Sequence, residues 1–217
     1  TLAQPFQKLV RQLLVASEPD LARWRDGIRE ALGPNGRLVT DLVPELALIV
    51  GEQPPVPELP AGQAQSRFQL VLRRLIGVFA RPEHPLVLAL DDLQWLDAAT
   101  LDLVDDLLTR ADLKHFLLIG AYRDNEVDIA HPLIRKLGAI RQAGALVNEL
   151  QLTPLVRDDL LQLTADALHC EPATAAPLAH LLHDKTDGNP FFAIQFLTEL
   201  AQEGLLAFEH KQSRCRW

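Results

Sequence analysis

Apolar positions follow different patterns in different parts of the chain, and each pattern predicts a different kind of element. In the first fifty residues they recur at helical spacing, for example at Leu9, Leu13 and Leu14. This spacing places them on one face of a helix, so it predicts short amphipathic helices. Four prolines between Gly51 and Gly62 exclude a regular helix there. We therefore expect 1–62 to form a helical segment that ends in a proline-rich crossing.

Local signals sharpen this first segment. Ser17, followed three residues later by Asp20 and with Pro19 between them, is typical of a helix start. Asn35-Gly36 is typical of a turn. The pattern therefore predicts that one helix begins after Ser17 and that the chain turns at Asn35-Gly36.

Three segments in the middle of the chain predict strands. Leu86–Leu90 and Phe116–Ile119 are continuous apolar runs, and Leu146–Leu152 is a weaker third strand. Continuous apolar residues are typical of strands that are buried on both faces of a parallel sheet. Because helical patterns lie between these runs, we expect an α/β fold with right-handed crossovers over 63–153.

The remaining helices are predicted from apolar spacing and from their end signals. The expected helices cover 64–80, 98–110, 132–142, 157–169, 173–186 and 190–203. After Pro154 the pattern gives no further strand until about 205–208. We therefore predict that 154–217 forms an all-helical subdomain that is distinct from the α/β part.

Two adjacent carboxylates, Asp91 and Asp92, follow the first predicted strand. In open α/β sheets ligands bind beside the carboxyl ends of the strands. Mg²⁺ is held there by one or two carboxylates together with phosphate and water oxygens, and a further carboxylate can activate a water. The alternative is that the two residues simply begin a polar loop.

Two further features are candidates for ligand contacts. Arg123 leaves the second predicted strand at the same edge, where its guanidinium can donate to a phosphate. The alternative for Arg123 is a surface ion pair with Asp124 or Glu126. Gly188-Asn189-Pro190 opens the last predicted helix, and a plain helix start accounts for all three residues.

Three stretches of sequence resemble the ATPase module of the signal-transduction (STAND, AAA-type) P-loop NTPases. LVLALDDLQWLDAATLDLVDDL resembles their Walker B strand with the helix after it, and LLIGAYRDNEVDIAHPL resembles their next strand and sensor region. KTDGNPFFAIQFLTELAQEGLL resembles their helical lid with its Gly-x-Pro motif. The resemblance runs from about Phe68 to Phe208. It is closest to modules found in large bacterial serine/threonine and histidine sensor kinases.

The resemblance implies a role for each candidate residue and a partial P-loop sheet followed by a helical lid. Asp91 would hold Mg²⁺ through water, and Asp92 would activate the attacking water. Arg123 would sense the γ-phosphate of ATP. Gly188 and Pro190 would line the adenine side of the nucleotide. The implied partners are other domains of the same polypeptide, namely kinase-like, GAF and histidine-kinase domains.

The Walker A motif GxxxxGK[ST] is absent, since none of the eleven glycines is followed by lysine. The chain contains no methionine and begins at Thr1, which favours a longer protein with this motif upstream. The alternative is a degenerate, nucleotide-free scaffold that mediates domain or protein interactions. In the family the P-loop strand lies beside the strand that matches 146–152. Without that neighbour we expect the isolated chain to be poorly stable or to self-associate.

Composition removes several other classes of function. The chain is 48% apolar and 23% charged, which is typical of a globular protein. A net charge of −8 argues against a nucleic-acid-binding surface. A third alternative, the ATPase part of a transcriptional activator, would therefore need a DNA-binding domain elsewhere. No apolar run approaches the roughly 20 residues that span a bilayer. Since no signal peptide is evident either, we expect a cytoplasmic protein.

The other polar residues favour structural roles. Cys170 and Cys215 are expected to be reduced thiols, and His180 and His183 lack a third metal ligand nearby. Asp97 is expected to cap the helix after it. The acidic residues of that helix are expected to form its solvated face; they are Asp102, Asp105 and Asp106.

Overall fold

The structure is a computed structural model that describes residues 3–110, 112–209 and 214–216, with the backbone alone from 207 onward. The chain divides into two compact units, Thr1–Val147 and Asn148–Trp217. Each unit has its own hydrophobic core, and we describe each by itself. The expected three-part division at 62/63 and 153/154 stays a prediction.

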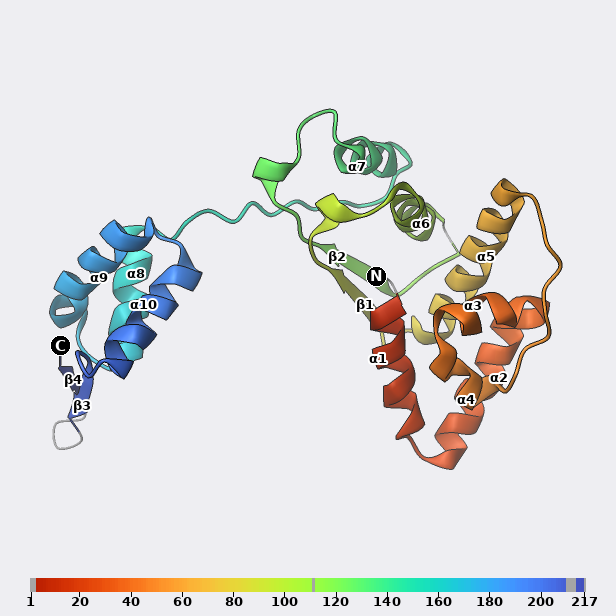
Figure 1. Ribbon diagram of the computed structural model, residues 1–217, viewed down its shortest axis with the longest axis horizontal. Helices are drawn as coiled ribbons and strands as arrows, with labels where there is room; N and C mark the ends of the chain where they lie inside the picture. The colour runs from red at the N-terminus through yellow and green to blue at the C-terminus, as the bar shows by residue number, and fades with distance from the viewer. Residues whose placement is uncertain (1–2, 111, 210–213, 217) are drawn as a thin grey trace. The chain divides into compact units, whose positions relative to one another are not determined.

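The first unit contains helices and two strands, in the order shown in Figure 1. The α-helices are α1 (Ala3–Leu14), α2 (Glu18–Leu32), α3 (Gly36–Leu42), α4 (Ala47–Val50), α5 (Ala61–Phe79), α6 (Ala98–Thr109) and α7 (Pro132–Gln142). The strands are β1 (Leu86–Leu90) and β2 (Phe116–Gly120). Four short 3-10 turns complete it: η1 (Gly33–Asn35), η2 (Pro44–Leu46), η3 (Leu93–Trp95) and η4 (Asp124–Glu126).

The predicted start of α2 is confirmed, whereas the predicted turn at Asn35-Gly36 is wrong. The Ser17 hydroxyl accepts a hydrogen bond from the Asp20 amide, and Pro19 lies in the first turn. Gly36 has helical dihedral angles and begins α3. A Cβ at Gly36 would overlap the side chain of Gln53. The glycine there therefore permits a close approach rather than a turn.

The sheet of this unit has two parallel strands. β1 pairs with β2 in register from Leu86 opposite Phe116 to Leu90 opposite Gly120. The predicted third strand over Leu146–Leu152 is wrong, because this segment is irregular and pairs with no strand among the residues described. A strand needs a neighbour for its backbone hydrogen bonds. The α/β class is confirmed, with a smaller sheet than expected.

Both faces of the sheet were expected to be buried, but in the structure only one face is packed into the core. Leu86 and Phe116 pack into a core with Ile76 of α5 and with residues of α6. On the opposite face Val87 and Leu117 are each more than half exposed. The continuous apolar sequence shows that both faces can be buried, but the helices of this unit cover the second face only in part.

One hydrophobic core joins α1–α5 with β1, β2 and α6. Ile28, Leu46 and Ile76 are fully buried in it. Burial of this apolar surface is the main stabilising contribution to the fold. The packed core in turn holds the two strands, and therefore their carboxyl ends, in place.

The expectation that the acidic residues of α6 are solvated is wrong for Asp106, which is 11% exposed, whereas Asp102 and Asp105 are partly exposed. The Lys136 Nζ atom of α7 lies 2.8 Å from Asp102 Oδ1 and 3.2 Å from Asp105 Oδ2. Asp106 forms an ion pair with Arg73 of α5, and both side chains are almost buried. The reason is that basic side chains reach these carboxylates from the helices on either side of α6.

The second unit is helical, as predicted. It contains α8 (Arg157–Leu168), α9 (Pro172–Thr186) and α10 (Pro190–Gln202). Its core is formed by Leu168, Leu178 and Leu182, with Phe196 of α10 packed against them. The strand expected near 205–208 is confirmed as β3 (Ala207–Glu209), which pairs antiparallel with β4 (Arg214–Arg216). The side chain of Cys215 lies outside the described residues, so the expected reduced thiols stay a prediction.

Candidate functional site

Parallel pairing brings Asp91, Asp92 and Arg123 to one edge of the sheet, as expected from the sequence. The two aspartates directly follow β1, and Arg123 lies three residues after β2. Figure 1 shows the two strands side by side. The Arg123 Nε atom lies 3.6 Å from Asp92 Oδ1. The structure therefore joins two of the three candidate residues in one ion pair.

The backbone at Asp92 makes the turn out of β1. Asp92 has a left-handed conformation, with φ 53° and ψ 47°, which aspartate tolerates better than most residues. Its amide donates to Asp91 Oδ1 at 2.9 Å. The next amide, that of Leu93, donates to the Ala121 carbonyl at 2.9 Å. The turn thereby ties the end of β1 to the residue after β2 and fixes the position of both aspartates.

Two residues that sequence reasoning did not select complete the site. Gln94 Nε2 donates to Asp92 Oδ1 at 2.9 Å and to Glu126 Oε2 at 3.2 Å. Arg123 Nη1 donates to Glu126 Oε1 at 3.1 Å. We call Asp92, Gln94, Arg123 and Glu126 the edge cluster. Glu126 entered the sequence analysis as a surface partner of Arg123, and that pair is confirmed.

The one signal for Gln94 was its position. It is a polar residue between Leu93 and Trp95, directly after the two aspartates. The sequence does not show that Gln94 is 7% exposed or that it reaches residues after β2. Burial of an amide requires hydrogen-bond partners, and here the partners come from both strand ends.

The charges of the site suit a magnesium-bound phosphate. Asp91, Asp92 and Glu126 bring three negative charges beside the single positive charge of Arg123. Within the described residues no three side chains of His, Cys, Asp or Glu form a complete metal site. Mg²⁺ in nucleotide sites takes only one or two carboxylates and completes its shell with phosphate and water oxygens. The donor set therefore fits Mg²⁺ with a phosphate ligand.

Asp97 has the structural role that the sequence indicates. Its carboxylate accepts from the Thr100 amide at 2.7 Å and caps α6. The hydrogen bond from the Thr100 amide lowers the pKa of Asp97 below its ordinary value. The cap stabilises the start of the helix that carries the α6 carboxylates.

The Gly188-Asn189-Pro190 motif begins α10 in the second unit. Asn189 Oδ1 accepts from the amides of Phe191 and Phe192, at 3.0 and 3.4 Å, and Pro190 occupies the first turn. Gly188 has a φ of +75°, and a Cβ there would overlap the carbonyl oxygen of Leu155. The helix-start interpretation is thus confirmed. A contact of Gly188 or Pro190 with adenine stays a prediction.

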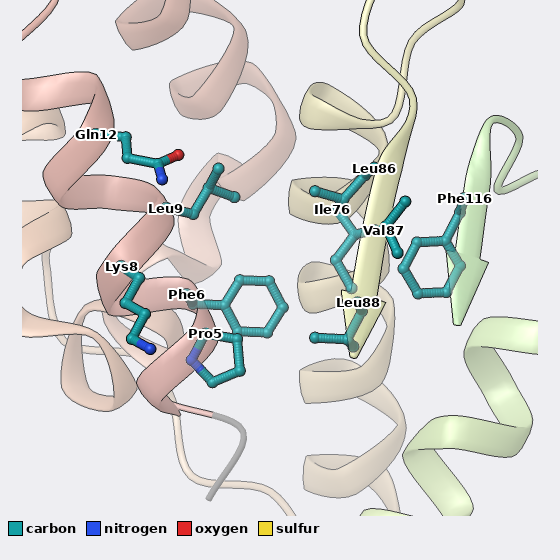
Figure 2. Close-up of a pocket in the computed structure, with 10 residues that line it drawn as sticks. All are labelled: Pro5, Phe6, Lys8, Leu9, Gln12, Ile76, Leu86, Val87, Leu88 and Phe116. Carbon is teal, nitrogen blue, oxygen red and sulfur yellow. The ribbon is translucent and has the colours of Figure 1, made fainter. Parts of the chain in front are cut away.

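A separate cavity of about 230 Å³ lies beside the amino-terminal half of β1. Figure 2 shows Phe6 and Leu9 of α1 facing Leu86 and Leu88 of β1 across it. Lys8 and Gln12 are its polar lining residues. A phosphate site needs several converging donors, so this apolar cavity does not resemble one. The edge cluster remains the better candidate.

Within the described residues no helix is both long enough and apolar enough to cross a bilayer.

The chain is similar to a curated protein and matches a family model. A curated relative is the hybrid signal transduction histidine kinase G of Dictyostelium discoideum, which is 24% identical over 283 residues. That match covers the whole of this chain but 8% of the length of the relative. No solved structure matches the chain. Residues 1–119 match the AAA ATPase domain family, a region that includes Asp91 and Asp92 and ends inside β2. Because the match covers more than half of the 217 residues, the chain belongs to the AAA ATPase domain family.

Proposed function

We propose that this chain is part of a regulatory module that binds and hydrolyses ATP in a signal-transduction kinase. The observation that carries the proposal is the meeting of Asp91, Asp92 and Arg123 at the carboxyl edge of a parallel sheet. Membership of the AAA ATPase domain family supports ATP and Mg²⁺ as the ligands. The curated relative, named as a hybrid signal transduction histidine kinase, supports the regulatory setting.

Each residue then has a defined task in hydrolysis. Asp91 would hold Mg²⁺, and Asp92 would orient the attacking water and accept its proton. Arg123 would donate to the γ-phosphate and stabilise the charge that develops on it. When bound, Mg²⁺ would neutralise part of the phosphate charge. Nucleotide occupancy then changes the position of the helical unit, and that unit biases neighbouring domains.

The proposal requires a Walker A loop from outside this sequence. The chain has no glycine followed by lysine, and it spans 8% of the length of the curated relative. In the irregular segment 146–152, Leu146, Leu150 and Leu152 are each at least 90% exposed. The same exposed leucines favour self-association of the isolated chain.

A nucleotide-free scaffold is the second candidate function. The observation that favours it is that Arg123 pairs with two carboxylates of its own chain, Asp92 and Glu126. In this alternative the edge cluster only stabilises the loops after β1 and β2. The module then acts as an interaction surface for kinase-like, GAF or histidine-kinase domains of the same polypeptide.

The test uses the protein at its full natural length. We expect Asp91→Ala to reduce Mg²⁺-dependent ATP hydrolysis at least 100-fold, because the carboxylate that holds the metal is lost. Asp26→Ala, an exposed aspartate on α2, is the matched control and should hydrolyse ATP like the wild type. ATP binding is measured by calorimetry on the same samples. Absence of ATP binding by the wild type, with signalling unchanged in Asp91→Ala, would establish the scaffold instead.

A further inference from the structure

Gln94 joins the ends of the two strands with three hydrogen bonds. Its Nε2 donates to Asp92 after β1 and to Glu126 after β2. Its Oε1 accepts from the backbone amide of Arg123 at 3.4 Å. The residue is 7% exposed, and its three hydrogen bonds are part-buried. Gln94 is therefore the buried residue of a cluster whose other side chains are 27% to 64% exposed.

A side-chain amide is the group that suits this position. It offers two donors for the two carboxylates and one acceptor for the amide of Arg123. A carboxylate would place a third negative charge against Asp92 and Glu126, and a lysine would leave the amide of Arg123 without an acceptor. An apolar side chain would leave all three groups without this partner. The three contacts therefore require the glutamine itself.

Gln94 and Arg123 hold the same two carboxylates but differ in their freedom to move. Arg123 donates to Glu126 Oε1 and lies 3.6 Å from Asp92 Oδ1. Its side chain is 64% exposed. Exposed ion pairs of this kind are weak, so an arginine can exchange them for a phosphate at small cost. Gln94, being buried, has no comparable alternative partner.

We propose that Gln94 is a positioning residue for ATP hydrolysis. It keeps Asp92 and Glu126 in place when Arg123 leaves them for the γ-phosphate. Without Gln94, the departure of Arg123 would free both carboxylates, and Asp92 would lose its orientation toward the attacking water. This inference rests on the proposed function of the same site, and it adds a residue that the Walker B and sensor assignments do not include.

The first test separates turnover from binding in the full-length protein. We compare Gln94→Met, which keeps the length of the side chain without its hydrogen bonds, with Gln94→Glu, which keeps one acceptor and loses both donors. We expect kcat to fall 10- to 100-fold, as for other positioning partners. KM for ATP should change less than about threefold, because the hydrogen bonds of Gln94 go to Asp92, Glu126 and the Arg123 amide. Gln65→Met is the matched control, since Gln65 is an exposed glutamine that donates to Asp102.

The second test needs no nucleotide. Hydrogen exchange of the Arg123 backbone amide, followed by NMR, should become about tenfold faster in Gln94→Met and stay unchanged in Gln65→Met. Wild-type hydrolysis combined with an unchanged kcat in Gln94→Met would overturn the inference and leave the proposed function standing. A wild type that binds no ATP would overturn the proposed function, and the exchange rate would then still report whether Gln94 restrains Arg123. Equal losses of kcat and of folded protein would reduce Gln94 to a structural residue and overturn its positioning role.

Discussion

Arg73 and Arg123 in the first unit each bind two carboxylates. Comparing them distinguishes an arginine that stabilises the fold from an arginine that belongs to the candidate site. Arg73 of α5 pairs with Asp106 and, at 3.0 Å, with Asp112. Arg123 pairs with Glu126 at 3.1 Å and Asp92 at 3.6 Å. The partners of both arginines are carboxylates. The burial of the two arginines differs, since the side chain of Arg73 is 12% exposed and that of Arg123 is 64% exposed.

Burial determines what each arginine can do. Burial alone lowers the pKa of Arg73, but hydrogen bonds to Asp112 and Asp106 outweigh it and raise the pKa, so Arg73 stays charged. Its loss would leave Asp106 almost buried with less compensation, which is costly. Arg123 is mostly hydrated in either state, so losing its pairs costs little. The same chemistry therefore fixes α5 against α6 in one place and leaves a cation available for a ligand in the other.

The largest expected effect tests this difference directly. Arg73→Met should destabilise the chain by about 3 kcal/mol, because it breaks a nearly buried ion pair. Arg123→Met should cost less than about 1 kcal/mol, because its pairs are exposed. Both are measured by urea unfolding. Arg74→Met, an exposed neighbour on the same helix, is the control and should be near neutral. Equal losses for Arg73→Met and Arg123→Met would show that burial does not separate the two roles.

A pair of glycines extends the comparison to the second unit. Gly188 and Gly204 have similar positive φ values, +75° and +73°. A Cβ at Gly188 would overlap the Leu155 carbonyl, whereas a Cβ at Gly204 would meet no atom within 4 Å. Alanine at either position carries the backbone strain, but only Gly188→Ala adds an overlap. We therefore expect Gly188→Ala to cost about 2 kcal/mol more than Gly204→Ala in thermal unfolding.

Gly204→Ala is thus the control for backbone strain. Equal costs for the two variants would show that the close approach of Leu155 is not what requires Gly188. In that case, if only Gly188→Ala lost ATP binding, the result would support the predicted contact of Gly188 with the nucleotide.

The sequence was sufficient where the answer depends on neighbouring residues in the chain. The cap by Ser17, the helix start at Asn189 and the runs that become β1 and β2 are all local patterns. The meeting of Asp92 with Arg123 followed as well, because carboxyl ends of parallel strands share one edge.

The predictions failed where the answer depends on a partner far away in the sequence. Leu146–Leu152 has the composition of a strand, but a strand forms only beside another one. Asp106 was expected in solvent because an acidic helix face is usually solvated, and the reach of Arg73 from α5 was not visible in the pattern. Gln94 was missed for the same reason, since its partner Glu126 is 32 residues away.

The smallest expected effect comes from the ion pair between Lys136 and Asp102. The exposure of Lys136, 25%, lies between that of Arg73 and that of Arg123. The hydrogen bond from Lys136 lowers the pKa of Asp102 below its ordinary value of 3.8, against a smaller opposing effect of burial. A carboxyl with a lowered folded pKa stabilises the fold above the unfolded value, and this stabilisation is lost as the pH falls through the folded pKa. Since Asp102 is 46% exposed, its contribution should stay below about 1 kcal/mol.

We therefore expect Asp102→Asn to flatten the loss of stability below about pH 4, with little change near neutral pH beyond the loss of this small contribution. Urea unfolding across pH 3 to 7 measures it. The control is Asp26→Asn, since Asp26 is exposed on α2. This variant should lose stability below about pH 4 to the same extent as the wild type. Added salt should reduce the Asp102 effect, because partly exposed pairs are screened, whereas the cost of Arg73→Met should persist in salt. An Asp102 effect as large and as salt-resistant as that of Arg73 would show that the partial exposure of the Lys136 pair does not weaken it, and the ordering by burial would then fail.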